Sequence, residues 1–234
     1  MWSGPRNIST ALMRSFESRA DCVVVDEPFY AFYLERTGID HPGRDDVLAS
    51  QPTDWHEVLR GLDEPLPGGA RIQYQKQMVH HLLDEVDRDW MAGVRHAFLI
   101  RDPRRMLASY ARKRESVRLE DLGLREELDL FRWLCDRDGK PPPVLDAHDL
   151  RADPPRMLAR LCDALGIPFD PAMLRWAPGP RASDGIWAPH WYDAVLASTG
   201  FHPETAERPE LPRELEALFD LARPFYDELA AHRL

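Results

Sequence analysis

The sequence predicts an α/β fold of the P-loop type, in which a mostly parallel central sheet is flanked by helices in three layers. Short apolar runs rich in β-branched residues alternate with segments of helical periodicity. A turn containing Gly4 and Pro5 leads directly into a helix start. With 234 residues, of which 44% are hydrophobic, the chain can bury one substantial core, so we expect a single domain over residues 1–234.

Composition restricts the classes of ligand. The formal net charge of -10 argues against binding to nucleic acid or to an acidic membrane surface, and a small-molecule site is expected instead. Cys22, Cys135 and Cys162 are odd in number and widely separated, as is typical of reduced core residues in a cytoplasmic protein. No apolar run approaches the length of a membrane span, and no secretory leader is evident, so we expect a soluble, unexported protein.

The N-terminal stretch from Met1 to Ser15 organises the prediction, although only Met1 and Trp2 precede the turn as a stub of a first strand. Free N–H groups at a helix N-terminus attract phosphate or sulfate, and Arg6 adds a fixed positive charge. Nucleoside triphosphatase loops continue with Gly-Lys-Ser/Thr, which this stretch lacks. An ordinary Ser-capped helix is the alternative. The candidate anion-binding residues are Gly4, Pro5, Arg6, Asn7, Ile8, Ser9 and Thr10.

The first half of the chain then alternates between strands and helices. The run Cys22–Val25 predicts a buried strand that is followed directly by Asp26 and Glu27. Residues 31–63, with one helix over Trp55–Leu62, form either an excursion over the acceptor side of the site or a plain surface insertion. Arg71–Lys76 alternates like a strand, and Met78–Val86 follows a helical period. His80 and His81 fall on different faces of that helix, where packing or capping is the alternative to catalysis.

The second half repeats this alternation. Strands are predicted over Val94–Ile100 and Val144–Ala147. Asp102 as N-cap and Pro103 at the first helical position predict a helix through Arg114, which explains Asp102 better than magnesium binding does. Residues 177–201 are irregular and aromatic, and we expect them to cover a flat ligand. Further helices are predicted over Leu119–Arg137, Pro154–Leu165 and Pro212–Leu234, the last with a possible kink at Pro224.

Positive side chains follow several of these strands. The carboxyl ends of parallel strands meet at one edge of a sheet, so Arg6, Lys76, Arg101 and Arg181 are expected to converge there with the first helix N-terminus. Ser109 lies eight residues after Arg101, about two turns into the next helix, and both can reach one phosphate. The sequence therefore predicts a polyanion site.

At this point the chain resembles the sulfotransferases that use 3'-phosphoadenosine 5'-phosphosulfate (PAPS). Their loop of the type Pro-Lys-Ser-Gly-Thr-Thr corresponds to Pro5–Thr10, with Arg6 and Ile8 in place of the usual Lys and Gly. Their Arg at a strand end, followed eight residues later by Ser, corresponds to Arg101 and Ser109. The segments Asp149–Pro168 and Pro180–Gly185 are also similar to the family's region after the last strand and to its late basic loop.

The resemblance implies a role for each matched residue. The loop, with Ser9 and Thr10, would hold the 5'-phosphosulfate, and Glu27 is similar to the glutamate base of bacterial carbohydrate sulfotransferases. His80 or His81 is the alternative base. Lys76 and Arg6 would stabilise the departing phosphate. The residues expected to bind the rest of the nucleotide are Arg101, Ser109 and Arg181 on the 3'-phosphate and Trp187, or a nearby aromatic, on adenine.

The resemblance further implies a bacterial transferase without a metal, which converts PAPS to 3',5'-adenosine bisphosphate (PAP) and which we expect in the cytoplasm. The acceptor would be a hydroxyl or amine of an unidentified small molecule or carbohydrate, and a homodimer is possible. Three alternatives stay open. A P-loop kinase could use Arg6 and Asp102, a degenerate family member could bind the nucleotide without catalysis, and Lys76 could in principle carry pyridoxal phosphate.

Overall fold

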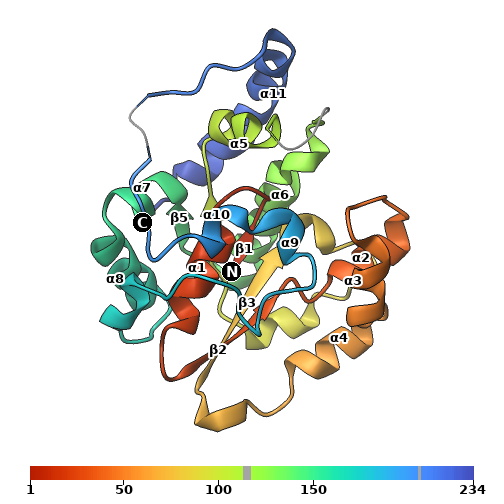
Figure 1. Ribbon diagram of the computed structural model, residues 1–234, viewed down its shortest axis with the longest axis vertical. Helices are drawn as coiled ribbons and strands as arrows, with labels where there is room; N and C mark the ends of the chain where they lie inside the picture. Colours follow the sequence, from red (N-terminus) through yellow and green to blue (C-terminus); the bar gives the residue numbers. More distant parts are fainter. Residues whose placement is uncertain (113–116, 205–206) are drawn as a thin grey trace. The chain divides into compact units, whose positions relative to one another are not determined.

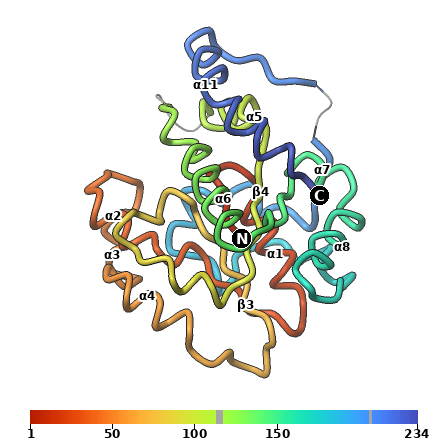
Figure 2. The backbone as a smooth tube through the Cα atoms, turned by 180° about the vertical axis from the view of Figure 1, so that it is seen from behind, coloured from red at the N-terminus to blue at the C-terminus, as the bar shows by residue number. Residues whose placement is uncertain are grey.

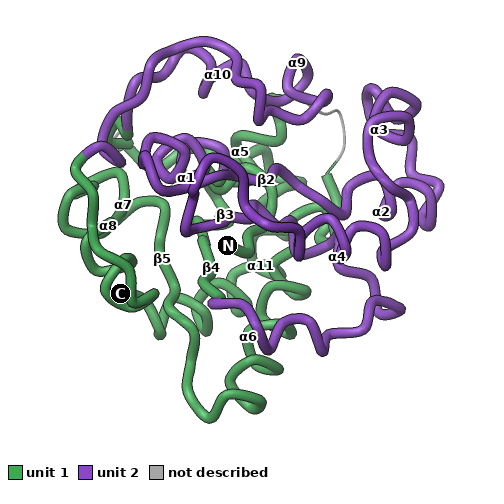
Figure 3. The backbone as a smooth tube through the Cα atoms, turned by 90° about the horizontal axis from the view of Figure 1, so that it is seen from below, with its two compact units in different colours: residues 1–9, 96–171, 201–234 green, residues 10–95, 172–200 purple. Residues whose placement is uncertain are grey.

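The computed structural model describes residues 1–112, 117–204 and 207–234. These residues fall into two compact units, which Figure 3 distinguishes by colour. Unit 1 comprises residues 1–9, 96–171 and 201–234, and unit 2 comprises residues 10–95 and 172–200. Each unit therefore combines segments that are far apart in the sequence.

Unit 1 is built on three parallel strands, β1 (Trp2–Ser3), β4 (Phe98–Ile100) and β5 (Val144–Asp146). Trp2 pairs with Phe98, and Leu99 pairs with Leu145. All of these strand residues are buried, as expected for parallel strands covered on both faces. The helices of this unit are α5 (Pro103–Tyr110), α6 (Leu124–Asp138), α7 (Ala147–Ala152), α8 (Pro154–Ala164) and α11 (Arg213–Ala230), with a short 3₁₀ helix, η4, over Glu120–Leu122.

Local chemistry determines where several of these helices begin. The Asp102 carboxylate accepts the Arg104 N–H at 2.8 Å ahead of α5, and Asp146 caps α7 in the same way through the N–H of His148 at 2.7 Å. Figures 1 and 2 show α11 lying along α5 and α6, where Phe219 packs with Met106 and other apolar side chains. The chain ends beside β5, because the Leu234 N–H donates to the Val144 carbonyl at 2.9 Å.

Unit 2 contains the parallel pair β2 (Cys22–Asp26) and β3 (Ile72–Met78), in which Asp26 lies opposite Lys76. Helix α1 (Ser9–Glu17) starts at the last residue of the first segment of unit 1. The other helices are α2 (Tyr30–Thr37), α3 (Arg44–Ser50), α4 (Trp55–Leu62), α9 (Ala188–Trp191) and α10 (Asp193–Leu196). Short 3₁₀ helices are η1 (Pro67–Gly69), η2 (Val79–His81), η3 (Asp89–Gly93) and η5 (Pro171–Leu174), which crosses the unit boundary.

The α/β class with parallel strands and flanking helices is confirmed. The helix expected over Met78–Val86 is wrong. Strand β3 continues to Met78, and only the single turn η2 follows, because the backbone at Leu82 leaves the helical region with φ −85° and ψ 85°. Burial of Met78, Val79 and His81 overrides the helical spacing of the apolar residues.

Other boundaries differ for identifiable reasons. The expected strand Val94–Ile100 begins only at Phe98, and the expected helix Leu119–Arg137 is divided at Gly123, whose φ of +67° cannot continue a helix. The C-terminal helix ends at Ala230 and includes Pro224. Residues 31–63 hold three helices rather than one, and the predicted helix through Arg114 is described only to residue 112, with α5 ending at Tyr110.

Candidate active site

The loop between β1 and α1 has an unusual backbone. Arg6 and Ile8 adopt left-handed conformations with φ of +64° and +60°, which few non-glycine residues tolerate. Buried Asn7 anchors the loop to β4, since its Nδ2 donates to the Leu99 carbonyl at 3.0 Å. A Cβ on Gly4 would lie 2.3 Å from the Leu122 carbonyl oxygen, so this position requires glycine. The loop is therefore held in a tight, strained turn at the start of a helix.

Arg101 and Ser109 contact this loop directly within unit 1. Nε of Arg6 donates to Oγ of Ser109 at 3.0 Å, and a guanidinium nitrogen of Arg101 donates to the Arg6 carbonyl at 2.8 Å. Arg101 immediately follows β4, and Ser109 lies near the end of α5. Nε of Arg101 has no hydrogen-bond partner among the described residues. Two segments about a hundred residues apart in sequence thus form one cationic, hydroxyl-bearing cluster.

Two further arginines extend this cluster around a single carboxylate. Glu204 pairs with Arg101, with Nε of Arg105 at 3.0 Å and with Arg151 at 2.9 Å. Burial raises the pKa of Glu204, but the arginines outweigh it and hold that pKa below its ordinary value. Glu204 is therefore an anion bound among three guanidinium groups.

In unit 2, Lys76 is the centre of a buried polar network. Its ammonium group donates to Asp26 at 2.8 Å, to Glu27 at 2.5 Å and to the Tyr192 hydroxyl at 2.7 Å. Burial alone would lower the pKa of Lys76, but the two carboxylates raise it well above its usual value. The Tyr192 hydroxyl in turn donates to Asp26 at 2.5 Å. Lys76 is therefore a permanent cation with all three donors engaged.

Glu27 is the strained member of this network. It leaves β2 with φ of +44°, while its N–H donates to the Lys76 carbonyl at 2.9 Å and its carbonyl accepts from Gln51 at 3.2 Å. Burial raises the pKa of its carboxyl, and the charge of Asp26 acts in the same direction, against the opposing charge of Lys76. A carboxylate whose pKa is raised accepts a proton more readily than an exposed glutamate, as a general base must.

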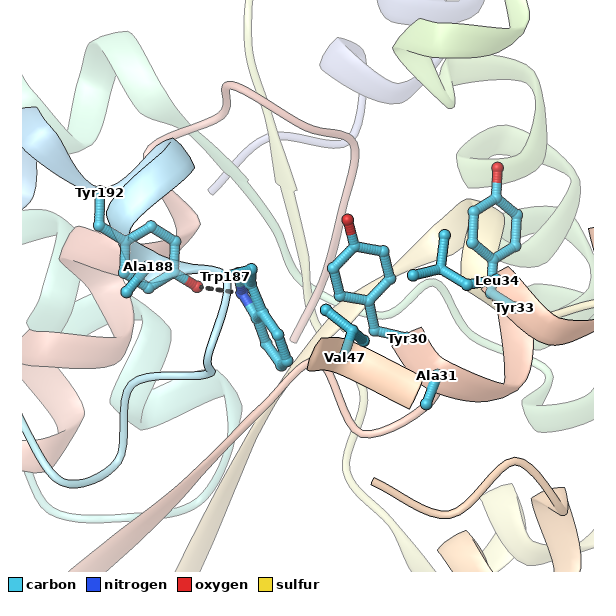
Figure 4. Close-up of a cluster of buried hydrophobic side chains, with 8 residues drawn as sticks. All are labelled: Tyr30, Ala31, Tyr33, Leu34, Val47, Trp187, Ala188 and Tyr192. Carbon is cyan, nitrogen blue, oxygen red and sulfur yellow. Dashed lines mark hydrogen bonds between the residues drawn. The ribbon is translucent and has the colours of Figure 1, made fainter. Parts of the chain in front are cut away.

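Aromatic rings line the region beside Glu27. The His81 ring stacks between Tyr30 and Tyr33, with centroid separations of 4.6 and 4.7 Å. Its Nδ1 lies 3.9 Å from the Glu27 carboxylate and has no hydrogen-bond partner among the residues described. Burial lowers the pKa of His81 well below its usual value, so the ring is neutral at physiological pH. Figure 4 shows Tyr30 and Tyr33 in the cluster that also contains Trp187 and Tyr192.

Comparison with known proteins identifies the family. A family model described as a sulfotransferase domain matches residues 1–233. The chain belongs to the sulfotransferase domain family. Two curated Arabidopsis thaliana proteins, named branched-chain-amino-acid aminotransferase-like proteins 1 and 2, are 38% and 36% identical to this sulfotransferase domain over 231 residues. The match covers 99% of this chain and 41% of each relative, so the chain spans about two fifths of their length.

Solved sulfotransferase structures share the fold. The sulfotransferase domain of the Synechococcus PCC 7002 olefin synthase is 19% identical with a TM-score of 0.54, over 96% of this chain and 92% of that one. A sulfotransferase domain from the curacin biosynthetic pathway is 13% identical with a TM-score of 0.57, over 98% of this chain and 95% of that one. A sulfotransferase from Alicyclobacillus acidocaldarius is 15% identical with a TM-score of 0.59, over 100% of this chain and 95% of that one.

The sulfotransferase domain brings some predicted residues together within each unit. Arg6, Arg101 and Ser109 meet in unit 1, and Glu27 and Lys76 meet in unit 2. Of the two histidines, His81 faces Glu27, while the His80 ring packs edge-on against Tyr33. The remaining loop residues are divided between the units: Gly4, Pro5, Asn7, Ile8 and Ser9 lie in unit 1, and Thr10 opens the first segment of unit 2.

Two predicted nucleotide contacts have other partners in unit 2. Arg181 donates to the Ala177 carbonyl at 3.1 Å and approaches Glu17 at 4.0 Å. Trp187 is 2% exposed, and its indole N–H donates to Tyr192 at 3.1 Å, as the dashed line in Figure 4 shows. An indole that is buried to this extent offers little surface for adenine to stack on. We therefore assign Trp187 to the core of unit 2.

Sequence reasoning missed several site residues. The sequence marks Asp26 only as part of an acidic strand end, by its place after the apolar run of β2 and beside Glu27. Tyr192, Arg105, Arg151 and Glu204 carried no local signal, because their partners lie elsewhere in the sequence. Among residues 1–112, 117–204 and 207–234, no group of His, Cys, Asp and Glu could hold a metal ion, and no helix is long and apolar enough to cross a membrane.

Proposed function

We propose that this sulfotransferase domain transfers the sulfuryl group of PAPS to a hydroxyl or amine of a small molecule or carbohydrate. The observation that carries the proposal is the pair of hydrogen bonds linking Arg6 with Ser109 and Arg101 with the Arg6 carbonyl. The loop motif and the Arg-Ser motif are expected to bind opposite ends of one nucleotide. Their direct contact within unit 1 supports a common ligand.

The donor would bind through charge and backbone N–H groups. The N-terminus of α1, beginning at Ser9, favours an anionic group by its dipole, and Arg6 adds a full positive charge. Arg101 and Ser109 would bind the 3'-phosphate through charge-assisted hydrogen bonds. Arg6 would also stabilise the 5'-phosphate as its negative charge grows. The strained backbone of the loop fixes these donors in advance.

The acceptor would be activated in unit 2. As the acceptor oxygen or nitrogen bonds to sulfur, the bond between sulfur and the bridging oxygen of the 5'-phosphate breaks, and PAP leaves with those electrons. Glu27 would take the proton that the acceptor loses. Its raised pKa gives it more basicity than an exposed glutamate. Because transfer of this kind is loose and in-line, positioning and charge stabilisation would supply most of the rate.

The hydrogen bonds around Lys76 indicate that this residue positions the Glu27 carboxylate. All three of its N–H donors are engaged by Asp26, Glu27 and Tyr192, so the cation orients the Glu27 carboxylate. Stabilisation of the departing phosphate by Lys76 would require one of these bonds to be exchanged. We therefore assign that stabilisation first to Arg6.

Calorimetric titration of the purified chain with PAP tests the donor site. We expect PAP to bind, and to bind more tightly than magnesium-ATP, because Arg101 and Ser109 would grip a 3'-phosphate. Ser109→Ala should weaken PAP binding, while Ser50→Ala, which alters a hydroxyl bonded to the Val47 carbonyl, should not. Magnesium-dependent ATP binding with no affinity for PAP would refute the proposal and indicate a kinase.

Release of PAP from PAPS in the presence of phenols, hexoses and amines then tests transfer. We expect at least one acceptor class to accelerate PAP release and to yield a sulfated product by mass spectrometry. Tight PAP binding with no transfer to any acceptor would identify a nucleotide-binding protein instead of an enzyme.

A further inference from the structure

A cluster of three arginines around Glu204 is more extensive than the two donor motifs require. Arg101 follows β4, Arg105 lies in α5 and Arg151 lies in α7, yet all three guanidinium groups contact the same carboxylate. The Glu204 side chain is only 2% exposed. Arg151 also donates through Nε to the His202 carbonyl at 2.5 Å, which fixes the chain next to Glu204.

Within the part of the chain that the structure describes, three guanidinium groups share the Glu204 carboxylate, and His148 places a further nitrogen 3.7 Å from it. Two carboxylate oxygens cannot accept from every N–H donor of three guanidinium groups, and holding like charges together is unfavourable. A phosphate monoester carries about 1.5 to 2 negative charges and three acceptor oxygens, so it satisfies such a cluster better than a carboxylate does.

The cluster is also continuous with the donor residues. Arg101 belongs to both, because one of its guanidinium nitrogens donates to the Arg6 carbonyl while another contacts Glu204. Arg6 is in turn bonded to Ser109. The Nε atom of Arg101 is buried and has no hydrogen-bond partner among the described residues, which leaves a donor for a ligand. Arg105 lies on the same helix as Ser109.

We propose that Arg105 and Arg151 bind the 3'-phosphate of the donor nucleotide together with Arg101, and that Glu204 is a carboxylate stand-in which this phosphate displaces. This inference rests on the proposed function for the identity of the ligand. Glu204 keeps the three guanidinium groups gathered and competes with the nucleotide for them. A ligand without a 3'-phosphate has no means of displacing it, so Glu204 also contributes to discrimination between nucleotides.

The competition predicts a specific effect of removing the Glu204 charge. When only a fraction of the molecules has the arginines available, the apparent dissociation constant rises in inverse proportion to that fraction. Glu204→Gln should therefore bind PAP more tightly, by roughly tenfold if Glu204 is paired in nine molecules of ten. Affinity for 5'-AMP, which lacks the 3'-phosphate, should stay the same. A merely structural ion pair would give the opposite result, since its loss would loosen the site.

The test is calorimetric titration of wild type and variants with PAP and with 5'-AMP. The control for Glu204→Gln is Glu210→Gln, which removes an equal charge from an exposed position in the same segment. Arg105→Gln and Arg151→Gln should each weaken PAP binding severalfold and leave 5'-AMP binding unchanged. Their control is Arg156→Gln, because Arg156 is exposed and pairs with its near neighbour Asp153 at 2.9 Å.

The outcomes separate this inference from the proposed function. If wild type binds PAP but Glu204→Gln binds it no more tightly, the competition is refuted and the proposed function stands. Should Glu204→Gln be poorly folded, unchanged PAP affinity in both Arg105→Gln and Arg151→Gln would refute the site by itself. Inorganic phosphate provides an independent probe. If Glu204→Gln gains affinity for phosphate although no variant transfers a sulfuryl group, the phosphate site is supported and the enzymatic proposal fails. If neither PAP nor phosphate binds any form, both fail.

Discussion

Replacing Glu27 by Gln tests the assignment of the general base. Gln keeps an acceptor for the Lys76 ammonium, which now donates to the carboxylate at 2.5 Å, but it cannot take a proton from the acceptor. A positioned general base contributes about 10²- to 10⁴-fold to a rate. Because Glu27 is already oriented by Lys76 and its pKa is raised, we expect kcat to fall about 10³-fold, or ~4 kcal/mol in activation free energy.

Stability should change much less than the rate. Removing the carboxylate abolishes the cost of burying its charge, and it also removes an attraction to Lys76. These two effects oppose one another, and Lys76 keeps the Asp26 carboxylate at 2.8 Å as a counter-charge. The unfolding free energy should therefore change by less than the roughly 3–5 kcal/mol that an unpaired buried charge costs. Equilibrium urea unfolding of wild type and Glu27→Gln measures this difference.

The pH dependence gives the assay its specificity. Glu27 acts only when deprotonated, so kcat for PAP release in the presence of an acceptor should rise with pH through its pKa. Since burial raises that pKa, the midpoint should lie above the ordinary value of 4.5 for glutamic acid. In Glu27→Gln this acidic limb should disappear. The matched control is Glu35→Gln, an exposed position on α2.

Full activity in Glu27→Gln would refute the reasoning. The reasoning would also be refuted if kcat of the variant still rose with pH at an unchanged midpoint, because another group would then be titrating. In either case His81, whose Nδ1 lies 3.9 Å from the carboxylate, would become the first residue to replace.

Three further predictions concern unit 1. Arg101→Ala should raise KM for PAPS about 10- to 100-fold with kcat within a few fold, since it removes a charge-assisted contact; unchanged nucleotide affinity would contradict its role. Gly4→Ala should lower the unfolding free energy by about 1–3 kcal/mol, because the new Cβ would lie 2.3 Å from the Leu122 carbonyl oxygen; equal stability in urea would contradict this. At position 8, where φ is +60°, Ile8→Gly should be about 1 kcal/mol more stable than Ile8→Ala, and the reverse order in thermal unfolding would show that the turn is unstrained.

The parts of the site that were predictable depend on local chemistry. Asp102 and Pro103 mark the start of α5 by capping and by proline's fixed φ, so the end of β4 and the position of Arg101 follow from a few adjacent residues. The same is true of Glu27, which follows a β-branched run that is buried as a strand. Hydrophobic patterning was less reliable after Lys76. The apolar spacing fitted a helix over Met78–Val86, but the strand extends to Met78 and only the single turn Val79–His81 follows it.

The unpredicted residues depend on long-range contacts. Tyr192 is 116 positions from Lys76, and Glu204 is 103 positions from Arg101. Glu204 is surrounded by other acidic and basic residues in a sequence that is 30% charged, so neither spacing nor composition distinguishes it. Such pairs are determined by how segments pack in three dimensions, which one sequence without its relatives does not encode in a local pattern.

The substitution of Ile8 for the glycine of related loops illustrates how sequence and backbone can diverge. The left-handed region costs a β-branched residue about 1–2 kcal/mol, whereas glycine adopts it without this cost. Ile8 nevertheless has φ of +60°, and Arg6 and Glu27 are likewise left-handed. The sequence also marks all three positions as candidate site or loop residues. Strain of this kind persists only where surrounding contacts enforce it, as the Asn7 anchor to β4 and the bond from Arg101 to the Arg6 carbonyl do here. These contacts therefore hold the loop in a left-handed backbone conformation that glycine would adopt without them.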